Sequence, residues 1–174
     1  MNVVSPSVCN NLKSNNNTQF LKILLKGGTK MKSKTKISGK QIYNFTETKE
    51  FQVVDTDGHL MSLRKAEGIN KSSGQSAFMN DAKMTNISFD DLVMGNGPHE
   101  GYSTMEKDGD IGVSKWHGKI DTKIKDGIPT VTFEGTFSFV SGLGTFKNVV
   151  GGGGTYKGHF TSETSYEVDW EGEY

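Results

Sequence analysis

Strict alternation of apolar and polar side chains in the last third of the chain most constrains its fold. The first run places five small or apolar residues on one parity: Val131, Phe133, Gly135, Phe137 and Phe139. A second run near the C-terminus does the same with Tyr156, Gly158, Phe160, Tyr166, Val168 and Trp170. Successive side chains of a strand point to opposite faces, so each run predicts a strand with one buried and one wetted wall.

Asp-Gly pairs separate many of the strand-like runs. They occur at Asp57-Gly58, Asp108-Gly109 and Asp126-Gly127, and this dipeptide supplies the positive φ angles that primed hairpin turns require. No segment shows a helical period over more than about two turns. The pattern therefore predicts eight strands in an antiparallel meander, over residues 35–46, 48–55, 59–68, 81–94, 99–107, 110–124, 129–140 and 155–171.

Long, twisted antiparallel strands tend to curl and close on themselves. We therefore predict an all-β fold for residues 33–174, an antiparallel eight-stranded barrel of the calycin-like type. Residues 1–32 are rich in asparagine and contain one short apolar run, which predicts a flexible or partly helical leader. The interior of an eight-stranded barrel is either packed with side chains or holds one small ligand.

Charge and composition exclude several classes of protein. The chain has 20 basic and 20 acidic side chains, whereas a nucleic-acid binder normally carries an excess of positive charge. No apolar run is long enough to span a membrane, and no secretory signal is evident, so a cytoplasmic location is predicted. A single cysteine excludes an internal disulfide and cysteine-based zinc spacing. The four histidines lie on separate segments, so we expect neither a metal nor a cofactor.

A glycine-rich stretch from Gly142 to Gly154 is the most distinctive segment. Glycine-rich phosphate-binding loops join a strand to a helix, so that the phosphate meets the helix N-terminus. Here the glycines lie between two strand patterns, and no helical pattern follows. The stretch is therefore interpreted as a tight turn with glycines that relieve crowding between bent strands.

The run from Phe139 to Gly158, FVSGLGTFKNVVGGGGTYKG, resembles the hairpin of allene-oxide-cyclase-like barrels. This calycin-like family includes plant allene oxide cyclases, dirigent proteins and uncharacterised bacterial members, and Tyr166–Gly172 resembles the closing strand of the bacterial ones. The resemblance covers residues 33–174. It implies a barrel that binds an apolar small molecule, a homotrimer as one option, and cofactor-independent cyclisation or isomerisation as another. No catalytic position matches residue by residue, so catalytic residues stay unassigned.

Aromatic side chains of the strand patterns are the candidate ligand-binding residues. They are Tyr102, Trp116, Phe133, Phe137, Phe139, Tyr156, Phe160, Tyr166 and Trp170. Such rings either line an apolar cavity, in which a few polar groups orient a ligand, or fill the barrel. Two functions follow from these alternatives: a binding barrel for an apolar or aromatic small molecule, and a packed, non-catalytic barrel that serves as an interaction or assembly module.

Polar residues add one candidate to this set. His99 lies near the Asn96-Gly97 turn signal, where it is either an acid–base group at the barrel mouth or merely solvated. His117 and His159 share the parity of charged neighbours and are expected to face water, and His59 follows a turn and is expected to be exposed. The pair Asp90-Asp91 is interpreted as a bulge or bend in its strand.

Overall fold

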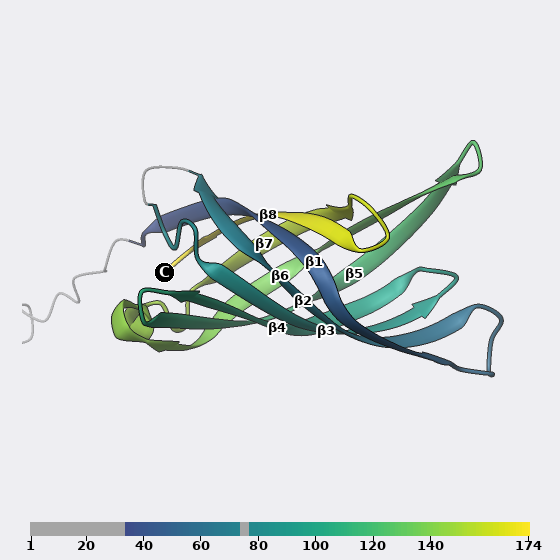
Figure 1. Cartoon of the computed structure of the whole chain (residues 1–174), viewed down its shortest axis with the longest axis horizontal. Coiled ribbons are helices and arrows are strands. Elements are labelled where there is room, and N and C mark those ends of the chain that lie inside the picture. The colour runs from purple at the N-terminus through teal and green to yellow at the C-terminus, as the bar shows by residue number, and fades with distance from the viewer. Residues whose placement is uncertain (1–33, 74–76) are drawn as a thin grey trace, which may run out of the picture. The chain divides into compact units, whose positions relative to one another are not determined.

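Eight strands form one closed barrel in the computed structural model, which describes residues 34–73 and 77–174 (Figure 1). The strands are β1 (Lys36–Gln52), β2 (His59–Ser73), β3 (Lys83–Val93), β4 (Gly97–Lys107), β5 (Asp110–Lys125), β6 (Ile128–Leu143), β7 (Gly153–Phe160) and β8 (Ser165–Glu173). Each strand pairs antiparallel with the next, and β8 pairs with β1 to close the sheet. The predicted fold class is confirmed, while the predicted leader over residues 1–32 lies outside the described residues.

Two predicted strand boundaries are wrong, and their errors cancel in the count. The predicted strands 35–46 and 48–55 are one strand, β1, with a β-bulge between Phe45 and Glu47. The predicted strand 155–171 is two strands, because the chain turns between Phe160 and Ser165. Phe160 and Tyr166 both point into the barrel. Because they are six residues apart, the apolar residues before and after the turn stay on the same parity, and the alternation does not reveal the turn.

All three Asp-Gly pairs lie between consecutive strands, as predicted. Asp57-Gly58 ends the turn between β1 and β2, and the other two pairs form tight hairpins. Asp108 and Gly109 have φ angles of 52° and 85°, and Asp126 and Gly127 have 53° and 78°. Positive φ at both central residues is the geometry of a type I′ turn, which matches the right-handed twist of the flanking strands. These turns join β4 to β5 and β5 to β6.

The turn between β3 and β4 lies two residues before its predicted place. Met94 and Gly95 have positive φ angles of 53° and 75°, whereas Gly97, with a φ of 157°, already begins β4. Asn96 lies after the turn, where its side-chain amide donates to the Met94 carbonyl at 2.9 Å. The Asn-Gly dipeptide therefore marks the start of a strand here.

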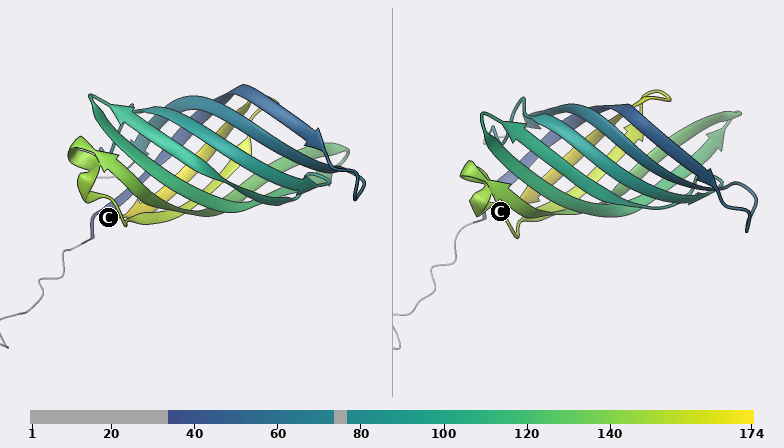
Figure 2. Two further views of the ribbon diagram at one scale, coloured as in Figure 1. Left: turned by 90° about the horizontal axis from the view of Figure 1, so that it is seen from below. Right: turned by 60° about the horizontal axis from the view of Figure 1, so that its bottom comes forward.

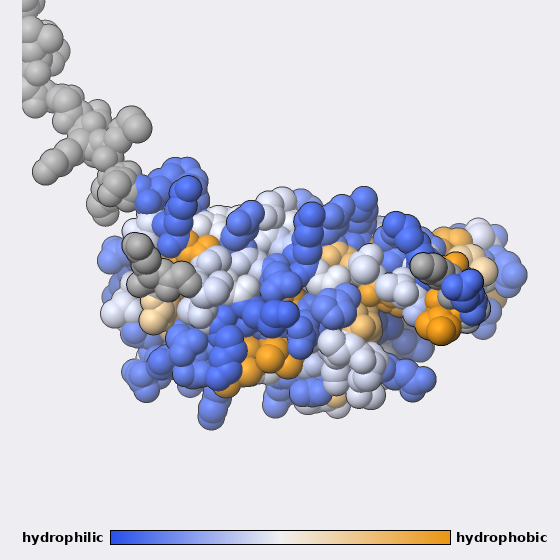
Figure 3. Space-filling view, turned by 90° about the horizontal axis from the view of Figure 1, so that it is seen from above, coloured by the Kyte–Doolittle hydropathy of each residue, from blue (hydrophilic) through white to orange (hydrophobic). Residues whose placement is uncertain are grey.

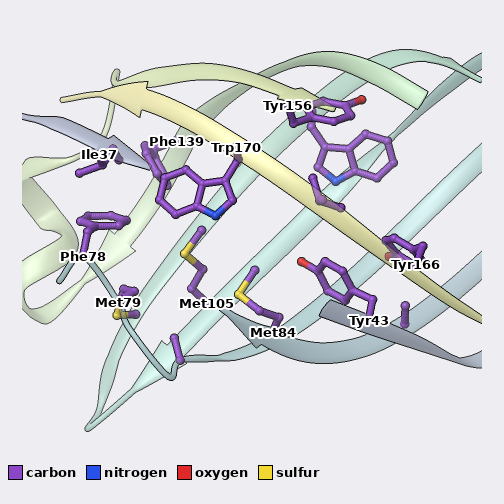
Figure 4. Close-up of a cluster of buried hydrophobic side chains, with 14 of the residues drawn as sticks. Ile37, Tyr43, Phe78, Met79, Met84, Met105, Phe139, Tyr156, Tyr166 and Trp170 are labelled. Atoms are coloured by element: carbon purple, nitrogen blue, oxygen red, sulfur yellow. The ribbon is translucent and has the colours of Figure 1, made fainter. Parts of the chain in front are cut away.

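One end of the barrel is closed by aromatic packing. The short 3₁₀ helix η1 (Gly144–Asn148) brings Phe146 against Phe78, with ring centroids 5.2 Å apart. Phe78 also packs against Phe139 at 5.8 Å and Trp170 at 6.2 Å (Figure 4). Asn70 is completely buried beside them, accepts from Trp170 Nε1 at 3.0 Å and donates to the Met79 carbonyl at 2.9 Å.

Hairpins project at the opposite end of the barrel, as both views of Figure 2 show. Their apolar side chains Val54, Ile124 and Ile128 are exposed, and Figure 3 shows hydrophobic residues at this end. Among residues 34–73 and 77–174, no helix is long and apolar enough to cross a membrane.

Glycines inside the barrel allow the aromatic rings to lie close to the wall. Gly118 and Gly135 are direct neighbours on β5 and β6, and Tyr156 of β7 pairs with Gly135. A Cβ atom built on these glycines would lie 2.6 Å and 2.5 Å from the Tyr156 hydroxyl. The same Cβ atoms would lie even closer to the Glu134 and His117 carbonyl oxygens, so any side chain larger than glycine would force the backbone or Tyr156 to move.

Candidate functional site

A cavity lies within the barrel above the closed end. It offers about 80 Å³ to the centres of water molecules, and one water needs roughly 10–15 Å³ by the same measure. The walls extend from Trp170 to Arg64 and Phe160 near the hairpin end. The space is therefore large enough for a small organic molecule or a group of waters.

Most of the predicted ligand-binding residues line this cavity. They are His99, Trp116, Phe133, Phe137, Tyr156, Phe160, Tyr166 and Trp170. Phe139 is buried instead in the closed end, where its ring centroid lies 5.5 Å from that of Phe137. Tyr102 is 49% exposed on the outer wall, with the Lys115 ammonium 5.8 Å from its ring centroid. Side chains alternate between the two faces of a strand. Because His99 and Ser103 of β4 point inward, Tyr102 faces solvent.

Asp90 is the main site residue that the sequence analysis missed. The β2–β3 register continues unbroken through Asp90 and Asp91, so the predicted bulge is wrong. Asp90 points into the cavity and is only 2% exposed, whereas Asp91 points outward. Every second residue of β3 points into the barrel. The first and last of these, Met84 and Leu92, are apolar, whereas the three between them are polar: Asn86, Ser88 and Asp90. This parity is the signal that could have identified Asp90.

The Asp90 carboxylate has one hydrogen bond and one nearby cation. Its Oδ2 accepts from Ser62 Oγ at 2.9 Å and lies 3.6 Å from Arg64 Nη1. Burial raises the pKa of Asp90, while Arg64 and the Ser62 hydroxyl oppose this shift. Arg64 also donates from Nη2 to Glu50 at 3.1 Å, and its guanidinium lies 5.3 Å from the Phe45 ring centroid.

His99 is buried directly across the β3–β4 register from Asp90. Its Nε2 lies 2.9 Å from the Tyr156 hydroxyl, and its ring centroid lies 4.9 Å from that of Trp116. Burial lowers the pKa of His99 to about 4, so the imidazole is neutral at pH 7. The solvated alternative for His99 is therefore wrong.

Asn86 organises the polar floor of the cavity. Its Oδ1 accepts from Trp116 Nε1 at 3.0 Å and from Ser103 Oγ at 2.9 Å, and its Nδ2 donates to the Tyr166 hydroxyl at 2.8 Å. By contrast, the buried Ser88 and Ser114 hydroxyls have no protein hydrogen-bond partner within the described chain. The polar floor of the cavity therefore combines the hydrogen-bonded network around Asn86 with two hydroxyls that have no partner among the described residues.

His59 is held between two carboxylates at the hairpin end, outside the cavity. Its side chain is 14% exposed, and Nδ1 and Nε2 each lie 2.6 Å from a carboxylate oxygen, of Asp55 and Asp91 respectively. The expectation of an exposed His59 is wrong, whereas His117 and His159 face solvent as predicted. The hydrogen bond to Asp91, followed by the one to Asp55, raises the pKa of His59.

Replacement of His59 by glutamine is expected to lower the melting temperature most at acidic pH. Because the folded-state pKa is raised, the stabilising contribution is complete below the unfolded pKa of about 6.5 and is lost as pH rises through the folded pKa. Thermal unfolding of wild type, His59→Gln and the exposed control His117→Gln from about pH 5.5 to about pH 9 measures this dependence. The same difference in melting temperature between wild type and His59→Gln at every pH would contradict a charged interaction of His59 with Asp55 and Asp91.

No metal site is evident at these residues. Among residues 34–73 and 77–174, no group of three or more histidine, cysteine or acidic side chains is arranged to hold a metal ion. The glycine-rich stretch forms the end of β6, η1 and the start of β7, consistent with its interpretation as a turn. The side chains that line the cavity offer hydrogen bonding, ion pairing and aromatic contact.

The fold and its interior define a closed, antiparallel eight-stranded β-barrel with an aromatic cavity and a partly unsatisfied polar floor. No model of a known protein family matches the sequence, and a search of curated proteins finds no match. The resemblance to allene-oxide-cyclase-like barrels therefore stays a prediction.

Proposed function

We propose that the barrel binds an apolar or aromatic small molecule in its cavity. The observation that carries this proposal is the combination of aromatic walls with buried polar atoms that have no protein partner in the described chain: the hydroxyls of Ser88 and Ser114 and Oδ1 of Asp90. Buried polar groups are normally hydrogen-bonded. A few convergent polar groups within apolar walls are typical of small-molecule sites.

The alternative, a packed barrel that serves as an assembly module, accounts less well for the interior. A packed barrel gains its stability by filling its volume and pairing its polar groups. Here about 80 Å³ stays open, and aromatic rings that could close it lie against the wall instead. These features favour a barrel whose interior is open to a ligand.

Both tryptophans of the chain line the cavity, so intrinsic fluorescence reports directly on its occupancy. Titration with the neutral apolar dye N-phenylnaphthylamine is expected to give saturable dye emission excited through Trp116 and Trp170. Ser114→Phe places a ring in the cavity and is expected to weaken dye binding roughly tenfold or more, because the dye and the new ring compete for one space.

The matched control is Lys115→Phe, the next residue of β5, which is exposed on the outer wall. It adds the same ring outside the barrel and is expected to leave the dye affinity within about twofold of wild type. Thermal unfolding of both variants separates loss of the site from loss of the fold. Absence of saturable binding to wild type, or full affinity in a folded Ser114→Phe variant, would refute the binding proposal.

Three further expectations rest on the family resemblance or on the sequence alone. They are cofactor-independent cyclisation or isomerisation of the bound molecule, a homotrimeric assembly and a cytoplasmic location. The mass of the native protein in solution tests the trimer. Product analysis of a compound released from the purified protein tests the chemistry.

A further inference from the structure

We propose that Asp90 anchors an ammonium group, so that the ligand of the cavity is a small amine with an aromatic or apolar body. This inference rests on the proposed binding function and specifies the class of ligand.

The first observation is an acid aimed into the cavity with an unused oxygen. The Asp90 side chain is 3% exposed and lines the cavity. Ser62 donates to its Oδ2 at 2.9 Å, whereas its Oδ1 has no hydrogen-bond partner within residues 34–73 and 77–174. An acceptor left without a donor in the interior is costly, and a donor on a ligand removes that cost.

The second observation is an imbalance of charge around Asp90. Two carboxylates, Asp90 and Glu50, share the guanidinium of Arg64, which hydrogen-bonds to Glu50 at 3.1 Å and stands 3.6 Å from Asp90. One positive charge therefore serves two negative charges. A buried carboxylate without a full partner attracts a cation more strongly than a surface one does, because water screens the pair less.

Within the described residues, no other side chain facing Asp90 supplies the missing positive charge. His99 lies opposite it in the β3–β4 register, but burial lowers the pKa of His99 to about 4 and leaves the imidazole neutral. Burial raises the pKa of Tyr156 and of Tyr166, so both hydroxyls keep their protons. The binding of an ammonium group would complete the charge balance of this cluster.

The third observation is the aromatic character of the walls around this acid. Phe45, Phe160 and Tyr166 form one group near Arg64, with the Phe45 centroid 5.1 Å from Tyr166 and 5.9 Å from Phe160. Aromatic faces attract cations through the ring quadrupole and also bury an apolar body. Rings and a single carboxylate together favour an organic cation over an inorganic one.

A matched set of ligands that share one phenyl ring tests this inference in the full-length protein. Isothermal titration at pH 7 compares 2-phenylethylamine, 2-phenylethanol and phenylacetate. The amine is expected to bind roughly tenfold or more tightly than the alcohol, and the carboxylate more weakly than either, because like charges repel.

Asp90→Asn is expected to remove the preference for the amine and to leave the alcohol affinity within about threefold of wild type. Asp91→Asn changes the adjacent, outward-facing acid in the same way and is expected to keep the preference. The wild-type ligand series remains decisive even where Asp90→Asn fails to fold.

Equal affinity of wild type for amine and alcohol, or a preference for the alcohol, would overturn the inference while the binding function stands. The same conclusion would follow if the dye bound and none of the three phenyl compounds did. A failure of the dye and of all three compounds would overturn the proposed function together with the inference.

Discussion

Asn70→Leu is expected to lower the free energy of unfolding by about 2–4 kcal/mol, because it removes the polar group that hydrogen-bonds across the closed end. Asn70 is completely buried, accepts from Trp170 Nε1 and donates to the carbonyls of Phe78 and Met79. Leucine has a similar volume and no hydrogen-bonding group. The substitution would leave the buried Trp170 Nε1 donor without an acceptor, at about 1–3 kcal/mol. The Phe78 and Met79 carbonyls would lose one donor each but keep the Ser72 hydroxyl and the Ala82 N–H.

Denaturant unfolding followed by tryptophan fluorescence measures the loss. Asn44→Leu is the matched control, since Asn44 lies exposed on the outer face of β1 and accepts one hydrogen bond from Ser165. Its cost is expected to stay below about 1 kcal/mol. Equal costs for the two substitutions would show that the closed end does not depend on the Asn70 hydrogen bonds.

Gly135→Ala is expected to cost about 2–3 kcal/mol, since overpacking a tight interior forces side chains or backbone to move. The added Cβ would lie closest to the His117 carbonyl oxygen, and then 2.5 Å from the Tyr156 hydroxyl and 2.7 Å from its Cζ. Tyr156 would have to leave its 2.9 Å contact with His99. We therefore expect the variant to lose both stability and dye affinity.

Gly127→Ala provides the control for this prediction. Gly127 lies in the β5–β6 turn with φ +78°, and a Cβ there would meet no atom within 4 Å. Its cost is expected to be about 1 kcal/mol, from backbone strain alone. Thermal and denaturant unfolding of both variants compares the two effects. A cost for Gly135→Ala no larger than that for Gly127→Ala would contradict the close approach of Tyr156 to the wall.

The barrel could be predicted from the sequence because its signals are local. Alternation along β6 fixes the inward face of Phe133 and Phe137, and Asp108-Gly109 fixes a hairpin wherever the strands lie in space. The turn after Phe160 was missed because it returns Tyr166 to the same parity. The bulge at Phe45 and Glu47 was missed because one extra residue interrupts the alternation in the same way as a strand end.

The site was harder to predict because its inward residues are partly polar. Alternation identifies a buried face only where that face is apolar, so it does not assign Asn86, Ser88 and Asp90 to the interior. The contact between Asp90 and Arg64 joins β3 to β2. It depends on the register between these two strands, which cannot be derived from the sequence alone. Tyr102 shows the opposite error. Its aromatic character suggests an inward position, but His99 points inward on the same strand, and Tyr102 has the opposite parity.

The central claim is that this barrel holds a ligand inside, and a crystal structure of the protein with N-phenylnaphthylamine tests it most directly. Dye density is expected within the barrel, between Trp116, Phe133 and Tyr156. An apolar dye also has an alternative place on the outer wall, where exposed Leu63 and Phe89 are direct neighbours on β2 and β3. Density at that outer surface alone, with the interior closed by side chains, would contradict the account.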